Sequence, residues 1–124
     1  MTNLNLRLLV ADDAPFIREI VRHVAEKNGI ELVGEAADGA EAVTLAQTLK
    51  PDVILMDIIM PKMSGIEATK AILESLPSTK IIAFSTTDQE TVVIRALEAG
   101  CVSFVVKPFK AEELLAVIRK AAAK

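Results

Sequence analysis

Apolar runs alternate with amphipathic stretches along this chain of 124 residues. The amphipathic stretches repeat their apolar side chains every three or four positions, which is the period of a helix with one buried face. The first of them carries Ile17, Ile20, Val21 and Val24 on one stripe. The other runs have the length of strands, and the third and fourth are apolar enough to be buried on both faces of a sheet. The predicted strands are residues 6–11, 31–36, 53–57, 80–84 and 102–106.

Start and stop residues mark the ends of the predicted helices. Pro15 stands where a first helical turn tolerates proline, and Gly29 is a typical helix stop. Asp38 is a predicted N-cap, and Pro77 ends the third helix. The predicted helices are residues 15–28, 39–50, 66–76, 89–99 and 111–122. Strict alternation of five strands with five helices predicts an α/β fold, doubly wound, with a parallel sheet, right-handed crossovers and helices on both faces.

Polar residues stand at the ends of four predicted strands. Asp12 and Asp13 follow the first, Asp57 ends the third, Ser85 follows the fourth and Lys107 follows the fifth. In a parallel sheet these strand ends lie at the same edge, which is where open α/β sheets bind ligands. The sequence therefore predicts a site made of three carboxylates, one hydroxyl and one ammonium.

This set of side chains predicts a metal-assisted phosphoryl transfer. Three neighbouring carboxylates stay ionised together only if a cation joins them, and Mg²⁺ is the simplest hard cation with oxygen ligands. Asp57 is the expected nucleophile, Ser85 the expected hydrogen-bond donor to the phosphoryl group, and Lys107 the expected neutralising charge. Such a reaction needs positioning and charge compensation more than proton transfer.

Composition narrows the class of protein. Apolar residues make up 52% of the chain, with no Trp or Tyr, which predicts an aliphatic core for one domain over residues 1–124. The net charge of −3 argues against direct nucleic-acid binding. The single Cys101 excludes an internal disulfide and fits a reducing compartment. No apolar run approaches the roughly 20 residues of a membrane span, and no signal peptide is visible, so we expect a cytoplasmic protein without membrane insertion.

The chain resembles the receiver domains of two-component response regulators over essentially its whole length. The matching features are Asp12-Asp13, the segment 56–61 with Asp57, Gly65, Ser85, Phe104 and the segment 107–109. The resemblance implies a flavodoxin-like sheet of order 2-1-3-4-5. It further implies that Asp57 accepts a phosphoryl group from a phosphohistidine on a sensor histidine kinase, so that the protein is a signalling switch and not an ordinary enzyme.

The resemblance also implies roles for individual residues. Asp13 and Asp57 would bind Mg²⁺ directly, Asp12 would act largely through water, and the backbone carbonyl of Ile59 would supply a further ligand. Ser85 would move toward the phosphoryl group after phosphorylation.

The remaining implied features concern the response to phosphorylation. Phe104, the second member of the switch pair, would fill the space that Ser85 leaves, and the Lys107–Pro108 peptide bond would be cis. A downstream protein would bind the fourth helix, fifth strand and fifth helix.

Other interpretations stay open at the level of the sequence. Asp12 and Asp13 are also suited to capping the first helix, and Phe104 to static packing. No acidic residue precedes Phe104 within residues 100–106, which favours a stand-alone receiver of the chemotaxis type. The rivals are a phosphorelay intermediate and a receiver cut from a DNA-binding regulator.

Two further rivals belong to different classes. A magnesium-dependent phosphatase of the haloacid-dehalogenase type needs a second acid two residues after the nucleophile, where this chain has Ile59. A pseudo-receiver, acting only as an interaction module, would lack acids at the site. The apolar side chain of Ile59 cannot orient a hydrolytic water, so the lifetime of a phosphorylated state is not predicted.

Overall fold

A parallel sheet of five strands, in the order β2-β1-β3-β4-β5, forms the centre of the protein. The computed structural model describes residues 6–87 and 89–124. The strands are β1 (Arg7–Ala11), β2 (Glu31–Ala36), β3 (Val53–Asp57), β4 (Lys80–Ser85) and β5 (Ser103–Val106). The helices are α1 (Pro15–Lys27), α2 (Gly39–Leu49), α3 (Gly65–Ser75), α4 (Glu90–Ala99) and α5 (Ala111–Ala122). The predicted fold class, strand order and alternation are confirmed.

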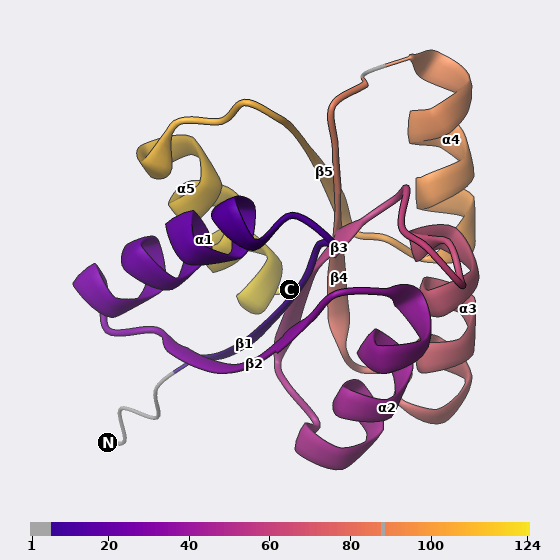
Figure 1. Ribbon diagram of the computed structural model, residues 1–124, viewed down its shortest axis with the longest axis horizontal. Helices are drawn as coiled ribbons and strands as arrows, with labels where there is room; N and C mark the ends of the chain where they lie inside the picture. Colours follow the sequence, from indigo (N-terminus) through magenta and orange to yellow (C-terminus); the bar gives the residue numbers. More distant parts are fainter. Residues whose placement is uncertain (1–5, 88) are drawn as a thin grey trace.

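The helices cover both faces of the sheet, with α1 and α5 on one face and α2, α3 and α4 on the other (Figure 1). Each face of the sheet packs against its helices in a separate hydrophobic core. Successive side chains of a strand point to opposite faces, so β3 contributes side chains to both cores. Ile54 packs with Ile72 of α3 in one core, and Leu55 packs with Ile118 of α5 in the other. All five residues of β3 are buried, which fits its central place in the sheet.

The helix ends follow the local sequence. The side chain of Asp38 accepts a hydrogen bond from the backbone N–H of Glu41 at 2.8 Å, so the predicted cap of α2 is confirmed. Ser64 and Glu67 form a capping box at the start of α3. The N-cap of α1 is Ala14, with no side-chain cap, so Asp12 and Asp13 do not cap that helix.

The strand ends differ slightly from the prediction. Ser85 is the last residue of β4, because it continues the ladder with Val106 of β5. The strand β1 begins at Arg7, and β5 begins at Ser103, one residue later than predicted in each case. Within residues 6–87 and 89–124, no helix combines the length and the apolar character that crossing a membrane requires.

Candidate acidic site at the carboxyl edge of the sheet

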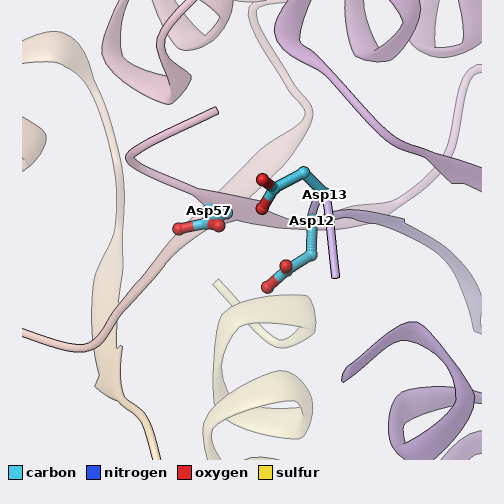
Figure 2. A group of neighbouring side chains, drawn as sticks. All are labelled: Asp12, Asp13 and Asp57. Atoms are coloured by element: carbon cyan, nitrogen blue, oxygen red, sulfur yellow. The ribbon is translucent and has the colours of Figure 1, made fainter. Parts of the chain in front are cut away.

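The three predicted carboxylates gather at the carboxyl edge of the sheet (Figure 2). Asp57 is the last residue of β3, and Asp12 and Asp13 directly follow the neighbouring strand β1. Each side chain offers one oxygen, and these oxygens all lie within 4.8 Å of one another. Asp12 is fully buried and Asp57 is 6% exposed, whereas Asp13 faces solvent. The predicted convergence of the strand ends is therefore present in the structure.

Lys107 lies between two of these carboxylates. Its ammonium donates a hydrogen bond to Oδ2 of Asp12 at 2.7 Å and lies 3.5 Å from Oδ2 of Asp57. Asp12 also accepts the backbone N–H of Ala14 at 2.9 Å. Lys107 is thus anchored on Asp12, while Asp57 keeps more of its capacity to accept hydrogen bonds or to bind an ion.

The carboxyl group of Asp57 has a pKa that differs from its ordinary value. Burial, followed by the negative charge of Asp12, raises the pKa of Asp57 to about 6. Lys107 and the backbone N–H of Ile59, which lies 3.4 Å from Oδ1, lower the pKa of Asp57 and oppose this shift. Lys107 and the N–H of Ile59 therefore do not fully offset the burial of Asp57 and the negative charge of Asp12.

The three carboxylates fit a divalent cation with oxygen ligands. Opposite ligands of an octahedral Mg²⁺ are roughly 4.2 Å apart, which is close to the 4.8 Å within which these oxygens lie. Small side-chain adjustments, or one water between an acid and the ion, would close that difference. The two hydrogen bonds that Asp12 already makes leave Asp13 and Asp57 as the better direct ligands.

Ser85 reaches the same edge from β4, the strand beside β3. Its buried hydroxyl accepts the backbone N–H of Thr87 at 3.3 Å, and its backbone carbonyl accepts the N–H of Lys107 at 2.7 Å. The alternation of side chains places Ser85 on the same face as Ala83, which pairs with Phe104 of β5. Ser85 and Phe104 therefore share one face of the sheet.

Phe104 and Ile59 occupy the margins of the site. Phe104 is half-buried and packs against the core beneath α2, α3 and α4. It also lines a cavity of about 270 Å³ with Val106 and Pro108. The side chain of Ile59 is 70% exposed. The Lys107–Pro108 peptide bond is cis.

A glycine brings α3 against the end of β3. A Cβ at Gly65 would meet the backbone carbonyl oxygen of Asp57, and its carbonyl carbon at 2.8 Å. The N–H of Gly65 also donates to the carbonyl of Ile58 at 2.8 Å. The turn that carries Asp57 is held in place by these close backbone contacts.

Two supporting residues were missed by sequence reasoning. The ring of Phe84 lies 4.8 Å from the ammonium of Lys107, where a cation–π contact orients the lysine. Arg18 donates from Nη1 to the backbone carbonyl of Asp12 at 2.7 Å. Phe84 directly precedes Ser85 in the sequence, which was a usable signal, but nothing in the sequence distinguishes Arg18 from an ordinary helix arginine.

The arrangement suits one kind of chemistry. A buried carboxylate stands beside an ammonium and two further acids, so it can attack an electrophile whose negative charge a cation and Lys107 would balance. There is no His among the described residues of this edge, since the only His of the chain, His23, lies on the exposed side of α1.

Comparison with known proteins identifies relatives over nearly the whole chain. The sequence model of the response regulator receiver domain matches residues 8–119. The chemotaxis protein CheY of Thermotoga maritima is 43% identical over 114 residues, which cover 92% of this chain and 95% of that protein. The transcriptional regulatory protein YxjL of Bacillus subtilis is 44% identical over 98% of this chain, which spans only 56% of that protein.

The fold has matches among solved structures as well. The response regulator domain of Thermotoga maritima CheB superposes with a TM-score of 0.90 at 39% sequence identity, and 98% of each chain is covered. The two proteins are therefore similar in sequence as well as in backbone fold.

Proposed function

Because the chain belongs to the response regulator receiver domain family, we propose that Asp57 accepts a phosphoryl group from a phosphohistidine of a sensor histidine kinase. The observation that carries this proposal is the placement of Asp57, which ends the central strand β3 beside Lys107 and the acids after β1. Receiver domains are signalling switches. The phosphoryl group therefore stays on Asp57 and acts by changing the conformation of the domain, and no metabolite is released.

The proposed step uses the side chains of this edge in distinct ways. A carboxylate oxygen of Asp57 attacks phosphorus, and the bond between phosphorus and the donor's imidazole nitrogen breaks, with its electron pair left on that nitrogen. Asp13, Asp57 and the backbone carbonyl of Ile59 would hold Mg²⁺, with Asp12 acting through water. When bound, the ion supplies charge compensation for the incoming phosphoryl oxygens.

Lys107 and Ser85 would respond to the phosphoryl group. The ammonium of Lys107 already lies 3.5 Å from Asp57, so it needs little movement to contact a phosphoryl oxygen. The hydroxyl of Ser85, which accepts the N–H of Thr87, would move and donate its own proton in a hydrogen bond to a phosphoryl oxygen. Phe104, on the same face of the sheet, would move into the space vacated. A partner that selects this conformer binds more tightly after phosphorylation.

The output surface we propose is formed by α4, β5 and α5. Three large apolar side chains are exposed on it, namely Ile94 and Leu97 of α4 and Val106 of β5. Exposed apolar side chains that gather on one face are typical of protein-binding surfaces. The downstream partner is therefore expected to be a protein.

The pathway we propose is chemotaxis or motility control, with the 124 residues as a single receiver domain. Support comes from CheY of Thermotoga maritima, of which the matched region covers 95%. The second candidate is the receiver of a DNA-binding regulator, which the match to YxjL favours. The gene distinguishes them, since a DNA-binding domain encoded in frame after residue 124 would contradict the stand-alone role.

The test of the phosphoryl-acceptor role is direct. The protein is incubated with acetyl phosphate and Mg²⁺, and its intact mass is measured. We expect a gain of one phosphoryl group that needs Mg²⁺ and is absent from Asp57→Asn. A matched Asp52→Asn variant, at the residue before β3 and so at the opposite edge of the sheet, should label like the unmodified protein. Labelling that persists in Asp57→Asn would refute the assignment.

The same experiment separates the other classes. A phosphatase would turn over simple phosphoesters such as p-nitrophenyl phosphate, whereas a receiver should not. A pseudo-receiver would neither turn over the ester nor gain a phosphoryl group. Comparing the decay of the label in the unmodified protein and in Ile59→Asn tests whether the exposed Ile59 side chain sets the lifetime of the phosphorylated state.

A further inference from the structure

A cavity separates the turn after β3 from α4, beside the acidic site but outside it. Its volume is about 290 Å³. It is lined by Ile58, Ile59, Met60, Ser64, Ile66, Val92 and Arg95. The turn, the start of α3 and the first turns of α4 each supply one wall, and Figure 1 shows α3 and α4 on the same face of the sheet.

Three of the lining side chains belong to the buried apolar core. Ile58, Met60 and Ile66 are buried members of the core, so they present a surface that does not need to form on binding. Ser64 belongs to the capping box of α3, which leaves its hydroxyl engaged with the backbone. At the rim, Ile59 has the largest exposed fraction, 70%, among the large apolar side chains of the described residues. The cavity is thus preformed, with one apolar side chain uncovered at its mouth.

Arg95 gives the cavity its polarity. It is the single charged residue of the lining, and it forms no ion pair with any residue in the ranges 6–87 and 89–124. A guanidinium at the edge of an apolar surface binds a carboxylate through two parallel hydrogen bonds. This cation beside an apolar cavity favours an occupant that carries an acidic residue together with aliphatic side chains.

The size and position of the cavity define the occupant further. Its volume is at the lower end of the roughly 300–1,000 Å³ of sites for whole small molecules, and it has room for one or two aliphatic side chains. Its lining residues belong to the turn after β3 and to the regions of α3 and α4, and none belongs to the edge strands β2 and β5, which argues against binding by addition of a strand. Among the other modes of peptide recognition, a helix is the one that places an apolar and an acidic side chain one turn apart on the same face, as the cavity and Arg95 require.

We propose that this cavity docks an acidic amphipathic helix of a partner protein, with a leucine-sized side chain in the cavity and a carboxylate on Arg95. The surface is distinct from the one formed by α4, β5 and α5, because Val92 and Arg95 lie on a different side of α4 from Ile94 and Leu97. Docking here covers Ile59, whose N–H contacts Asp57, so the bound helix lies over the turn that carries the acidic site.

The test uses a defined peptide as probe. A blocked, alanine-based helical peptide carries Leu and Glu one turn apart, and two control peptides replace Glu by Lys or Leu by Ser. Each is titrated into the isotope-labelled protein, and amide chemical shifts are followed. We expect saturable shifts centred on Ile59, Ile66, Val92 and Arg95 with the first peptide only. No phosphorylation is needed, so the outcome is independent of the proposed function.

Two variants of the protein complete the test. Arg95→Glu should lower the affinity for the acidic peptide about five- to tenfold. The same variant should bind the Lys-containing peptide more tightly than the unmodified protein does. Lys70→Glu, at an exposed position of α3 outside the cavity, changes the net charge equally and should leave binding within about twofold. Equal weakening by both variants, or shifts confined to α5 and β5, would overturn the proposal.

Discussion

At the scale of single residues, the acidic edge holds three carboxylates and one ammonium, so its charges are not balanced. Asp57 has a pKa raised to about 6 because it is buried and faces the negative charge of Asp12. Lys107 lowers the pKa of Asp57 but is held closer to Asp12 than to Asp57. A carboxylate in this state gains from an added cation, which agrees with the role proposed for Mg²⁺.

The raised pKa of Asp57 predicts how stability depends on pH. Its folded value of about 6 lies above the ordinary 3.8, so the folded protein holds this proton more tightly than the unfolded chain does. Without Mg²⁺, the ionised carboxylate therefore destabilises the fold above pH 6, and this cost is relieved as the pH falls toward 4. Asp57→Asn should raise the free energy of unfolding at pH 7 by about 1–2 kcal/mol.

The measurement is urea unfolding of both proteins in EDTA at several pH values between 4 and 7.5. The stability difference between Asp57→Asn and the unmodified protein should shrink as the pH falls. The matched control is Glu74→Gln, because Glu74 is exposed on α3, far from the acidic edge. A constant difference across this range would show that burial of the Asp57 charge is not its cause.

At the scale of elements, the junction of β3 and α3 fixes the position of Asp57. The helix begins at Gly65, where only a missing Cβ lets the backbone approach the carbonyl group of Asp57. The capping box of Ser64 and Glu67 holds the first turn of the same helix. The contact between Gly65 and Asp57 therefore leaves no room for a side chain, and Asp57 cannot shift without moving α3.

This junction predicts a large effect of a single methyl group. Gly65→Ala places a Cβ against backbone atoms of Asp57 and Ile58, which cannot rotate away as a flexible side chain would. We expect a loss of about 3 kcal/mol in the free energy of unfolding, at the upper end for overpacking. Urea denaturation followed by circular dichroism measures it.

Gly29→Ala is the matched control for this substitution. Gly29 has a φ of 71°, and no atom lies within 4 Å of the position that a methyl group would occupy there. The cost of this control substitution is therefore only the backbone strain of about 1–2 kcal/mol. If Gly65→Ala were no more destabilising than Gly29→Ala, the close approach of α3 to β3 would not be essential to the fold.

At the scale of the whole molecule, the site exists because a parallel sheet brings distant strand ends to one edge. Asp12 and Lys107 are 95 residues apart in the sequence, yet their side chains form a hydrogen bond of 2.7 Å. No single element contains the site, so an ion bound there joins β1 and β3 and favours the folded state over the unfolded chain.

Binding of Mg²⁺ should therefore raise the stability of the protein by linkage. At a free Mg²⁺ concentration 100 times its own dissociation constant, the free energy of unfolding should rise by about 2.7 kcal/mol. Thermal unfolding across a Mg²⁺ titration measures this effect, and excess EDTA should reverse it. Asp57→Asn removes one of the proposed direct ligands, so the unfolding midpoint of this variant should respond much less. An equal response in both proteins would place the ion elsewhere.

Local patterns in the chain were sufficient to predict the elements and the chemical composition of the site. The spacing of apolar residues indicated the alternation of strands and helices. Apolar residues that recur at the period of a helix or of a strand lie on one face of that element, and this period can be seen in the local sequence. Pro15, Gly29 and Asp38 marked helix ends, since caps and stops are local as well. Asp57 and Ser85 stood at the ends of apolar runs, so their shared edge followed from the parallel topology.

The way in which these groups meet became visible only in three dimensions. That Lys107 rests on Asp12 and the ring of Phe84, that Arg18 holds the backbone of Asp12, and that a cavity opens beside Arg95 all depend on residues far apart in the chain. The reason is that periodicity specifies which face a side chain occupies. Distances across strands and helices depend instead on sheet register and on packing between elements, which no local pattern encodes.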